Sequence, residues 1–124
     1  MSSMASPDPT EPHVLAVRRT PAGCELDLVV PADLVHFRGH FDGFPILPGV
    51  VQVDWALRLA ACHLAIGAAR AARMQLKFQH PVRPEMTLTL TLELAEKDGG
   101  HQLSFAYRSL DLPCASGRIS LEPA

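Results

Sequence analysis

The stretch that decides both fold and function is His36–Asp54, HFRGHFDGFPILPGVVQVD, which joins an irregular loop to a long apolar segment. The loop is rich in Gly, Pro, His and Phe, and long irregular loops in compact domains are usually functional. Pro48 is expected to open a helix, because the N–H that proline lacks would be unpaired at that position anyway. We predict that this helix continues to about Gly67 and, being apolar nearly all round, is buried on most faces.

The start of this helix combines groups that suit acid–base chemistry on a carbonyl compound. Backbone N–H groups at a helix N-terminus favour negative charge, and Gly49 lets a substrate approach them closely. Asp54 lies one turn after Val50 and has mostly apolar neighbours, so the sequence predicts a buried carboxyl able to donate a proton. His40 is the natural proton acceptor. Together these groups indicate proton abstraction beside a carbonyl with loss of a β-hydroxyl.

The rest of the chain alternates between apolar and polar residues in the manner of β-strands. Two short strands are expected at 14–19 and 25–30, before the loop. Further strands are expected at 74–78, 87–94, 103–107 and 115–121, with a hairpin turn at Asp98-Gly99-Gly100. One long buried helix with an antiparallel sheet curled around it defines an α+β fold.

Length and composition exclude several classes of protein. The 124 residues, 48% of them hydrophobic, fit a single domain at 13–124 preceded by a flexible tail at 1–12. A net charge of −2 lacks the basic footprint of nucleic-acid binding. The apolar window at 50–69 contains Asp54, Arg58 and His63, so we expect no membrane insertion. Three cysteines without CxxC spacing indicate reduced thiols in a cytoplasmic protein, with no disulfide framework and no zinc site.

Four short motifs follow the order and spacing of a known enzyme family. They are His36-Phe37, Gly39-His40-Phe41, Pro45-Ile46-Leu47-Pro48-Gly49 and Asp54. This pattern resembles the β-hydroxyacyl-acyl carrier protein dehydratases of the FabZ and FabA types, which have the hotdog fold. The resemblance covers about 35–93, and the phrase FPILPGVVQVDW is also similar to the dehydratases of aryl polyene clusters.

The resemblance implies a role for each motif position. His40 would be the catalytic base, Asp54 the acid that protonates the departing hydroxyl, and the Gly49 N–H the donor to the thioester carbonyl. Residues expected to contact the substrate are Phe44, Pro48, Val50 and Trp55.

The resemblance also implies a substrate and an assembly. The substrate would be a 3-hydroxyacyl thioester on an acyl carrier protein, dehydrated without a cofactor to the trans-2-enoyl thioester. His40 and Asp54 would meet across the interface of an obligate dimer, formed with a second copy or with a paralogue, or within a higher oligomer.

Two departures from the family pattern leave other functions open. Trp55 stands where a small residue is usual, and Arg58 stands where a Gln is common. Asp54 and Arg58 are four residues apart, so on a helix they can form a structural ion pair instead of a catalytic site. The alternatives are a hotdog acyl thioesterase and a non-catalytic acyl-binding subunit of a synthase. A metal site at His36, His40 and Asp42 is disfavoured, because four-residue spacing aligns ligands only on a helix.

The segment between Trp55 and Pro84 holds five basic residues and no acidic one. A solvated surface is the ordinary explanation for such a run. The sharper interpretation is a docking patch for an acidic acyl carrier protein, formed by Arg70, Arg73 and Lys77.

Overall fold

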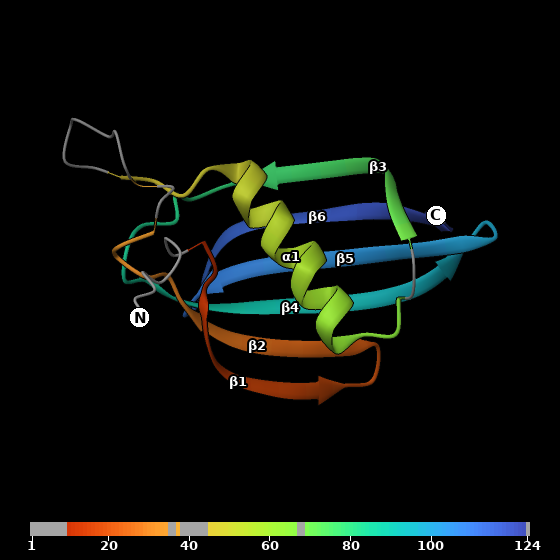
Figure 1. Ribbon diagram of the computed structural model, residues 1–124, viewed down its shortest axis with the longest axis horizontal. Coiled ribbons are helices and arrows are strands. Elements are labelled where there is room, and N and C mark those ends of the chain that lie inside the picture. Colours follow the sequence, from red (N-terminus) through yellow and green to blue (C-terminus); the bar gives the residue numbers. More distant parts are fainter. Residues whose placement is uncertain (1–9, 35–36, 38–44, 67–68, 124) are drawn as a thin grey trace, which may run out of the picture.

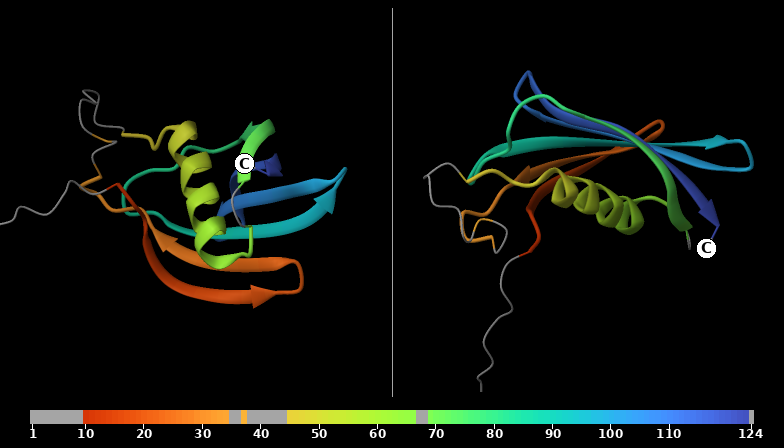
Figure 2. Two further views of the ribbon diagram at one scale, coloured as in Figure 1. Left: turned by 45° about the vertical axis from the view of Figure 1, so that its right-hand side comes forward. Right: turned by 90° about the horizontal axis from the view of Figure 1, so that it is seen from above.

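One helix and six strands make up the computed structural model, which describes residues 10–34, 37, 45–66 and 69–123. The elements are β1 His13–Thr20, β2 Gly23–Val29, α1 Gly49–His63, β3 Ala69–Phe78, β4 Thr87–Lys97, β5 Gly100–Ser109 and β6 Leu112–Pro123. The strands form one antiparallel sheet in the order β1-β2-β4-β5-β6-β3, and α1 crosses one face of it (Figure 1). The sheet curves around the helix, which confirms the predicted α+β hotdog arrangement (Figure 2).

Strand alternation builds the core between the sheet and the helix. In β4 the leucines at 88, 90 and 92 are buried, whereas the threonines between them lie on the opposite face. Leu26 and Leu28 of β2 pair with Leu90 and Leu88, so the two strands present one continuous apolar surface to α1. The turn predicted at Asp98-Gly99-Gly100 is present, with Asp98 and Gly99 as a two-residue loop in which both have positive φ.

Helix α1 begins at Gly49, one residue later than predicted, because Pro48 is its N-cap, and it ends at His63, earlier than expected. Leu64 is extended and only its N–H still bonds to the helix, at the carbonyl of Ala60. The prediction that the helix is buried on most faces is wrong for the single chain. Its buried residues are Gln52, Val53, Trp55, Ala56, Leu59 and Ala60. The opposite face, which carries Val50, Asp54 and Arg58, is exposed.

The segment just before β1 packs on the helix. Pro12 is buried, and the carbonyl of Thr10 accepts a hydrogen bond of 2.9 Å from the indole Nε1 of Trp55. Glu11 forms an ion pair with Arg58 at 2.6 Å. Residues 10–12, which the sequence assigned to a tail, are therefore held against the fold.

Strand β3 forms one edge of the sheet and pairs only with β6. Nine of its ten residues are exposed, including Met74, Leu76 and Phe78. The pairing register shifts between Ala71 and Arg73, as in a β-bulge. Exposed edge strands with an apolar row are available for pairing with another chain.

The three cysteines are free thiols that differ in exposure. Cys24 and Cys114 are buried, and burial raises the pKa of both thiols, whereas Cys62 is exposed on α1. No helix within the described ranges has the length and apolarity needed to cross a membrane.

Candidate active site

The predicted site residues that the structure describes gather at the first two turns of α1. Pro48, Gly49 and Val50 form the entry to the helix, and Asp54 and Trp55 follow one turn later. His40 and Phe44 lie outside the described residues, so their predicted roles as base and channel residue stay predictions. Asp42 and His36 of the disfavoured metal site lie outside them as well.

The helix entry is fixed by hydrogen bonds on both sides of Pro48. The Pro48 carbonyl accepts from the N–H groups of Val51 and Gln52 at 3.1 and 3.2 Å. The side-chain Nε2 of Gln52 donates to the carbonyl of Leu47 at 3.1 Å, and the Leu47 N–H donates to Val82 at 2.7 Å. These bonds tie the loop that leads into the helix to the helix itself and to the β3–β4 connection.

Gln52 was not predicted, although a lone amide in the apolar run GVVQVDW is a visible signal. Its side chain is buried, and its Oε1 has no hydrogen-bond partner among the described residues. Burying an amide oxygen without a hydrogen-bond partner costs free energy. The Gln52 side chain is therefore an unfavourable polar group among apolar side chains.

Gly49 lies where another part of the chain comes very close. A Cβ built at this position would lie 2.6 Å from Cζ of Phe78, so only glycine fits beneath the ring in its present position. The group that comes close to Gly49 is thus the end of β3, and the predicted close approach of a substrate to this backbone stays a prediction. The role of the Gly49 N–H as donor to a substrate carbonyl stays a prediction.

Tyr107 of β5 is a second residue that the sequence analysis missed. Its hydroxyl donates to the backbone carbonyl of Gln52 at 2.6 Å, from a fully buried position beneath the helix. Burial raises the pKa of the Tyr107 phenol, and the negative charge of Asp54 raises it further. Tyr107 is therefore a neutral hydrogen-bond donor that supports the first turn of α1.

Asp54 and Val50 share one face of the helix, as predicted, but that face is open in the single chain. The Asp54 side chain is 51% exposed and Val50 is 76% exposed. The predicted burial of Asp54 is therefore wrong here, because its apolar sequence neighbours Val53 and Trp55 point to other sides of the helix.

Asp54 also forms the ion pair that the i+4 spacing allowed. Arg58 Nε lies 2.8 Å from Asp54 Oδ2, and Arg58 Nη1 lies 2.6 Å from Glu11 Oε1. The pKa of Arg58 is raised, first by the charge of Asp54, then by the hydrogen bond to it and by the charge of Glu11. One guanidinium is thus bracketed by two carboxylates at the surface.

Trp55 is fully buried in the core, where its indole donates to Thr10. In the single chain it packs beneath the helix instead of lying beside Asp54 on the exposed face. Its predicted role in lining an acyl channel stays a prediction.

The three basic residues of the predicted docking patch share the outer face of β3. The register shift at Ala72 places Arg70 and Arg73 on the same side, opposite the apolar row. Arg70 pairs with Glu122 at 3.0 Å.

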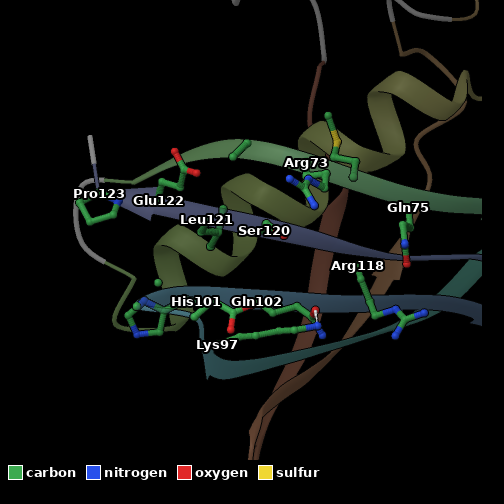
Figure 3. Close-up of a pocket in the computed structure, with 15 residues that line it drawn as sticks. Arg73, Gln75, Lys97, His101, Gln102, Arg118, Ser120, Leu121, Glu122 and Pro123 are labelled. Atoms are coloured by element: carbon green, nitrogen blue, oxygen red, sulfur yellow. Dashed lines mark hydrogen bonds between the residues drawn. The ribbon is translucent and has the colours of Figure 1, made fainter.

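Arg73 lines a groove of about 910 Å³ together with Arg118 of β6 and the hairpin that joins β4 to β5. Figure 3 shows this groove on the face of the sheet that points away from α1, so it does not touch Gly49 or Asp54.

Comparisons with known proteins agree with the motif pattern. The ApeI-like family model, described as ApeI dehydratase, matches residues 16–118. A FabZ 3-hydroxyacyl-[acyl-carrier-protein] dehydratase of Novosphingobium aromaticivorans is 39% identical over 71 residues, which are 49% of this chain and 44% of that protein. A FabZ of Rhizorhabdus wittichii is 38% identical over 73 residues, with 51% and 46% covered. The chain thus matches less than half the length of these curated relatives.

Solved structures extend the likeness over most of the chain. The dehydratase heterocomplex ApeI:P from Xenorhabdus doucetiae matches with a TM-score of 0.79 and 34% identity, covering 90% of this chain and 97% of that one. The PaaI protein of Escherichia coli, with a TM-score of 0.64 and 16% identity over 90% of this chain and 82% of its own, shares the fold alone. Because the family model spans most of the sequence, the chain belongs to the ApeI-like dehydratase family.

Proposed function

We propose that this protein dehydrates a 3-hydroxyacyl thioester on an acyl carrier protein to the trans-2-enoyl thioester, in fatty-acid or polyene-type biosynthesis. The observation that carries the proposal is the placement of Gly49 at the start of α1 and Asp54 one turn later, on a face left open by the fold. A backbone amide donor and a carboxyl are the types of group that suit a thioester carbonyl and the hydroxyl on its β-carbon.

Each bond change in the reaction has a group to serve it. His40 removes a proton from the carbon beside the carbonyl, and the electrons move into an enolate whose oxygen is held by the Gly49 N–H. As the enolate collapses, the bond from the β-carbon to the hydroxyl breaks, and Asp54 supplies the proton that makes the leaving group water. The hydrophobic residues Val50, Phe44 and Trp55 are the candidates for contact with the acyl chain.

A second subunit is part of the proposal. The face of α1 that carries Val50 and Asp54 is exposed in the single chain, and the apolar row of edge strand β3 is exposed as well. A homodimer, or a heterodimer with a paralogue, would cover these surfaces and bring a partner histidine to Asp54. The heterodimer is supported by the similar protein from Xenorhabdus doucetiae, which is part of the dehydratase heterocomplex ApeI:P.

The Arg58 contact is the observation that favours a different role. The Arg58–Asp54 ion pair is the structural role that competes with proton donation by Asp54. This supports the alternative of a non-catalytic acyl-binding subunit. Against it stands the second ion pair of Arg58 with Glu11, which shares the positive charge between two acids.

The deciding experiment is mass spectrometry of a 3-hydroxyacyl carrier substrate after incubation with the purified protein. Loss of one water supports the dehydratase, and His40→Ala should abolish it. Release of free thiol would identify a thioesterase instead. If the protein alone is inactive but dehydrates in the presence of a paralogue, the non-catalytic subunit is the better description.

The docking patch is tested with two substrates. Charge reversal at Arg70 and Arg73 should weaken turnover of the carrier-bound substrate while sparing a small thioester analogue, because only the former needs the protein contact. Equal loss on both substrates would count against docking at these residues.

A further inference from the structure

We propose that Arg58 and Glu11 are positioning residues for Asp54, with the segment before β1 supplying the Glu11 that controls how Arg58 acts on the Asp54 carboxyl. The inference rests on the proposed dehydratase function, since it assigns the acid of that reaction its immediate environment. It goes beyond the family pattern, because Arg58 stands where the family commonly has Gln.

The first step is that Glu11 is held in place by its neighbours. On one side, the carbonyl of Thr10 accepts from the buried indole of Trp55 at 2.9 Å. On the other side, Pro12 is buried and leads directly into β1. Glu11 is thus fixed between two anchored residues, and its carboxylate is presented to the exposed face of α1.

The Arg58 guanidinium contacts both carboxylates at once. Arg58 contacts Asp54 through Nε at 2.8 Å and Glu11 through Nη1 at 2.6 Å. These nitrogens belong to one rigid plane, so the Glu11 contact fixes the direction from which Arg58 meets Asp54. Among the described residues, the ion pair of Asp54 runs through Oδ2, and we assign Oδ1 to the reacting hydroxyl.

The charges of Arg58 and Glu11 both act on the Asp54 carboxyl. Arg58 alone would place an uncompensated positive charge 2.8 Å from the Asp54 carboxyl. Glu11 opposes this effect, because its negative charge offsets that of the guanidinium. Among the described residues, the charge of Asp54 also acts on Tyr107, which is neutral and buried beneath the helix. In the proposed dimer the partner's histidine would face the same carboxyl.

The experiment measures kcat against pH for the wild type, Glu11→Gln and Arg58→Gln. A general acid must be protonated, so its ionisation sets the alkaline limb of the profile. Glu11→Gln should move that limb to lower pH, and Arg58→Gln should move it to higher pH. Each shift should be a few tenths of a pH unit, as is usual for a surface ion pair. The double variant should resemble Arg58→Gln, because Glu11 acts through Arg58.

Three further variants separate charge, orientation and general surface effects. Arg58→Lys keeps the charge but loses the rigid plane, so it should lower kcat while leaving the limb near its wild-type position. The chain offers a matched control in Arg18, which is also bracketed by two carboxylates, Glu25 and Asp27. Arg18→Gln and Glu25→Gln should leave the profile unchanged.

The inference is overturned if the wild type is active and the alkaline limbs of the Glu11→Gln and Arg58→Gln profiles move in the same direction or do not move. A loss of kcat with an unchanged profile would mean that the cluster is only structural. If the wild type dehydrates nothing, the proposed function fails, and NMR titration of the Asp54 carboxyl carbon then decides the inference. Its midpoint must shift in opposite directions in Glu11→Gln and Arg58→Gln, and equal midpoints would refute the coupling.

Discussion

Two arginines of this protein are each held between two carboxylates, yet their surroundings differ. Arg18 on β1 lies 2.7 Å from Asp27 and 3.4 Å from Glu25, both on the neighbouring strand β2. Arg58 on α1 lies 2.8 Å from Asp54 on its own helix and 2.6 Å from Glu11, which is 47 residues away. The first cluster follows from strand register alone, since Arg18 and Glu25 are cross-strand partners. In the second cluster the contact with Glu11 depends on the segment before β1, which is anchored on the helix.

This difference separates a structural ion cluster from one beside a candidate active site. The Arg18 cluster stabilises a hairpin, and solvent screens it. In the Arg58 cluster, Asp54 lies five residues after Gly49 on the same helix, and it is the acid that the proposed reaction would need. Similar chemistry at the surface therefore has different consequences, depending on what lies next to it.

The largest expected effect compares the two aspartates. Asp54→Asn should lower turnover of a 3-hydroxyacyl thioester by ~10²–10⁴-fold, because a general acid is removed. Asp27→Asn, which also removes a carboxylate paired with arginine, should leave turnover unchanged. Steady-state rates on one substrate measure both variants, and similar rates for the two would remove the functional distinction between the clusters.

The anchor of the second cluster gives the next effect. Trp55 is fully buried, so Trp55→Ala should lower the free energy of unfolding by about 3–5 kcal/mol. Trp55→Phe retains much of the packing but loses the hydrogen bond to Thr10, and should cost less. Urea unfolding measures both variants. A small loss for Trp55→Ala would mean that the helix is not held by this side chain.

Tyr107 tests the support beneath the helix start. Tyr107→Phe removes the hydroxyl that donates to Gln52 at 2.6 Å, and should cost about 1 kcal/mol of unfolding free energy. Thermal or urea unfolding gives the value. Phe105→Leu, at a buried position on the same strand, is a control for packing changes without loss of a hydrogen bond.

The smallest effect concerns the pH dependence of the Arg18 cluster. The hydrogen bond from Arg18 is the largest of the influences that lower the pKa of Asp27 below its ordinary value of 3.8. A lowered pKa in the folded state stabilises the fold above that ordinary value, and the stabilisation is lost as pH falls through the lowered value. Asp27→Asn should therefore destabilise the protein slightly at pH 7 and reduce the loss of stability on acidification. An unchanged acid unfolding curve would show that the pair contributes nothing.

Local patterns account for what the sequence predicted well. The alternation in TLTLTLEL gave the buried face of β4, and Asp98-Gly99 gave its hairpin, because both signals depend on neighbouring residues. Pro48 marked the helix start for the same reason. The motif pattern pointed to the family, which the comparisons bear out.

The features that sequence reasoning missed depend on contacts between distant residues. The exposure of Asp54 depends on how the helix is rotated about its axis relative to the sheet. This rotation cannot be inferred from the apolar residues next to Asp54 in the sequence. No local pattern links Glu11 to Arg58 or Thr10 to Trp55. In the sequence Tyr107 is one more apolar position of an alternating strand. Its hydrogen bond to the Gln52 carbonyl depends on how the helix packs on the sheet.

The contact between Gly49 and the ring of Phe78 has a consequence for protein engineering. Any side chain added at position 49 would have to displace the ring, since its Cβ would lie 2.6 Å from Cζ. The helix start and the end of the edge strand are thus not independent design variables. A library meant to reshape this corner should vary both positions jointly, pairing each enlargement at 49 with a smaller residue at 78.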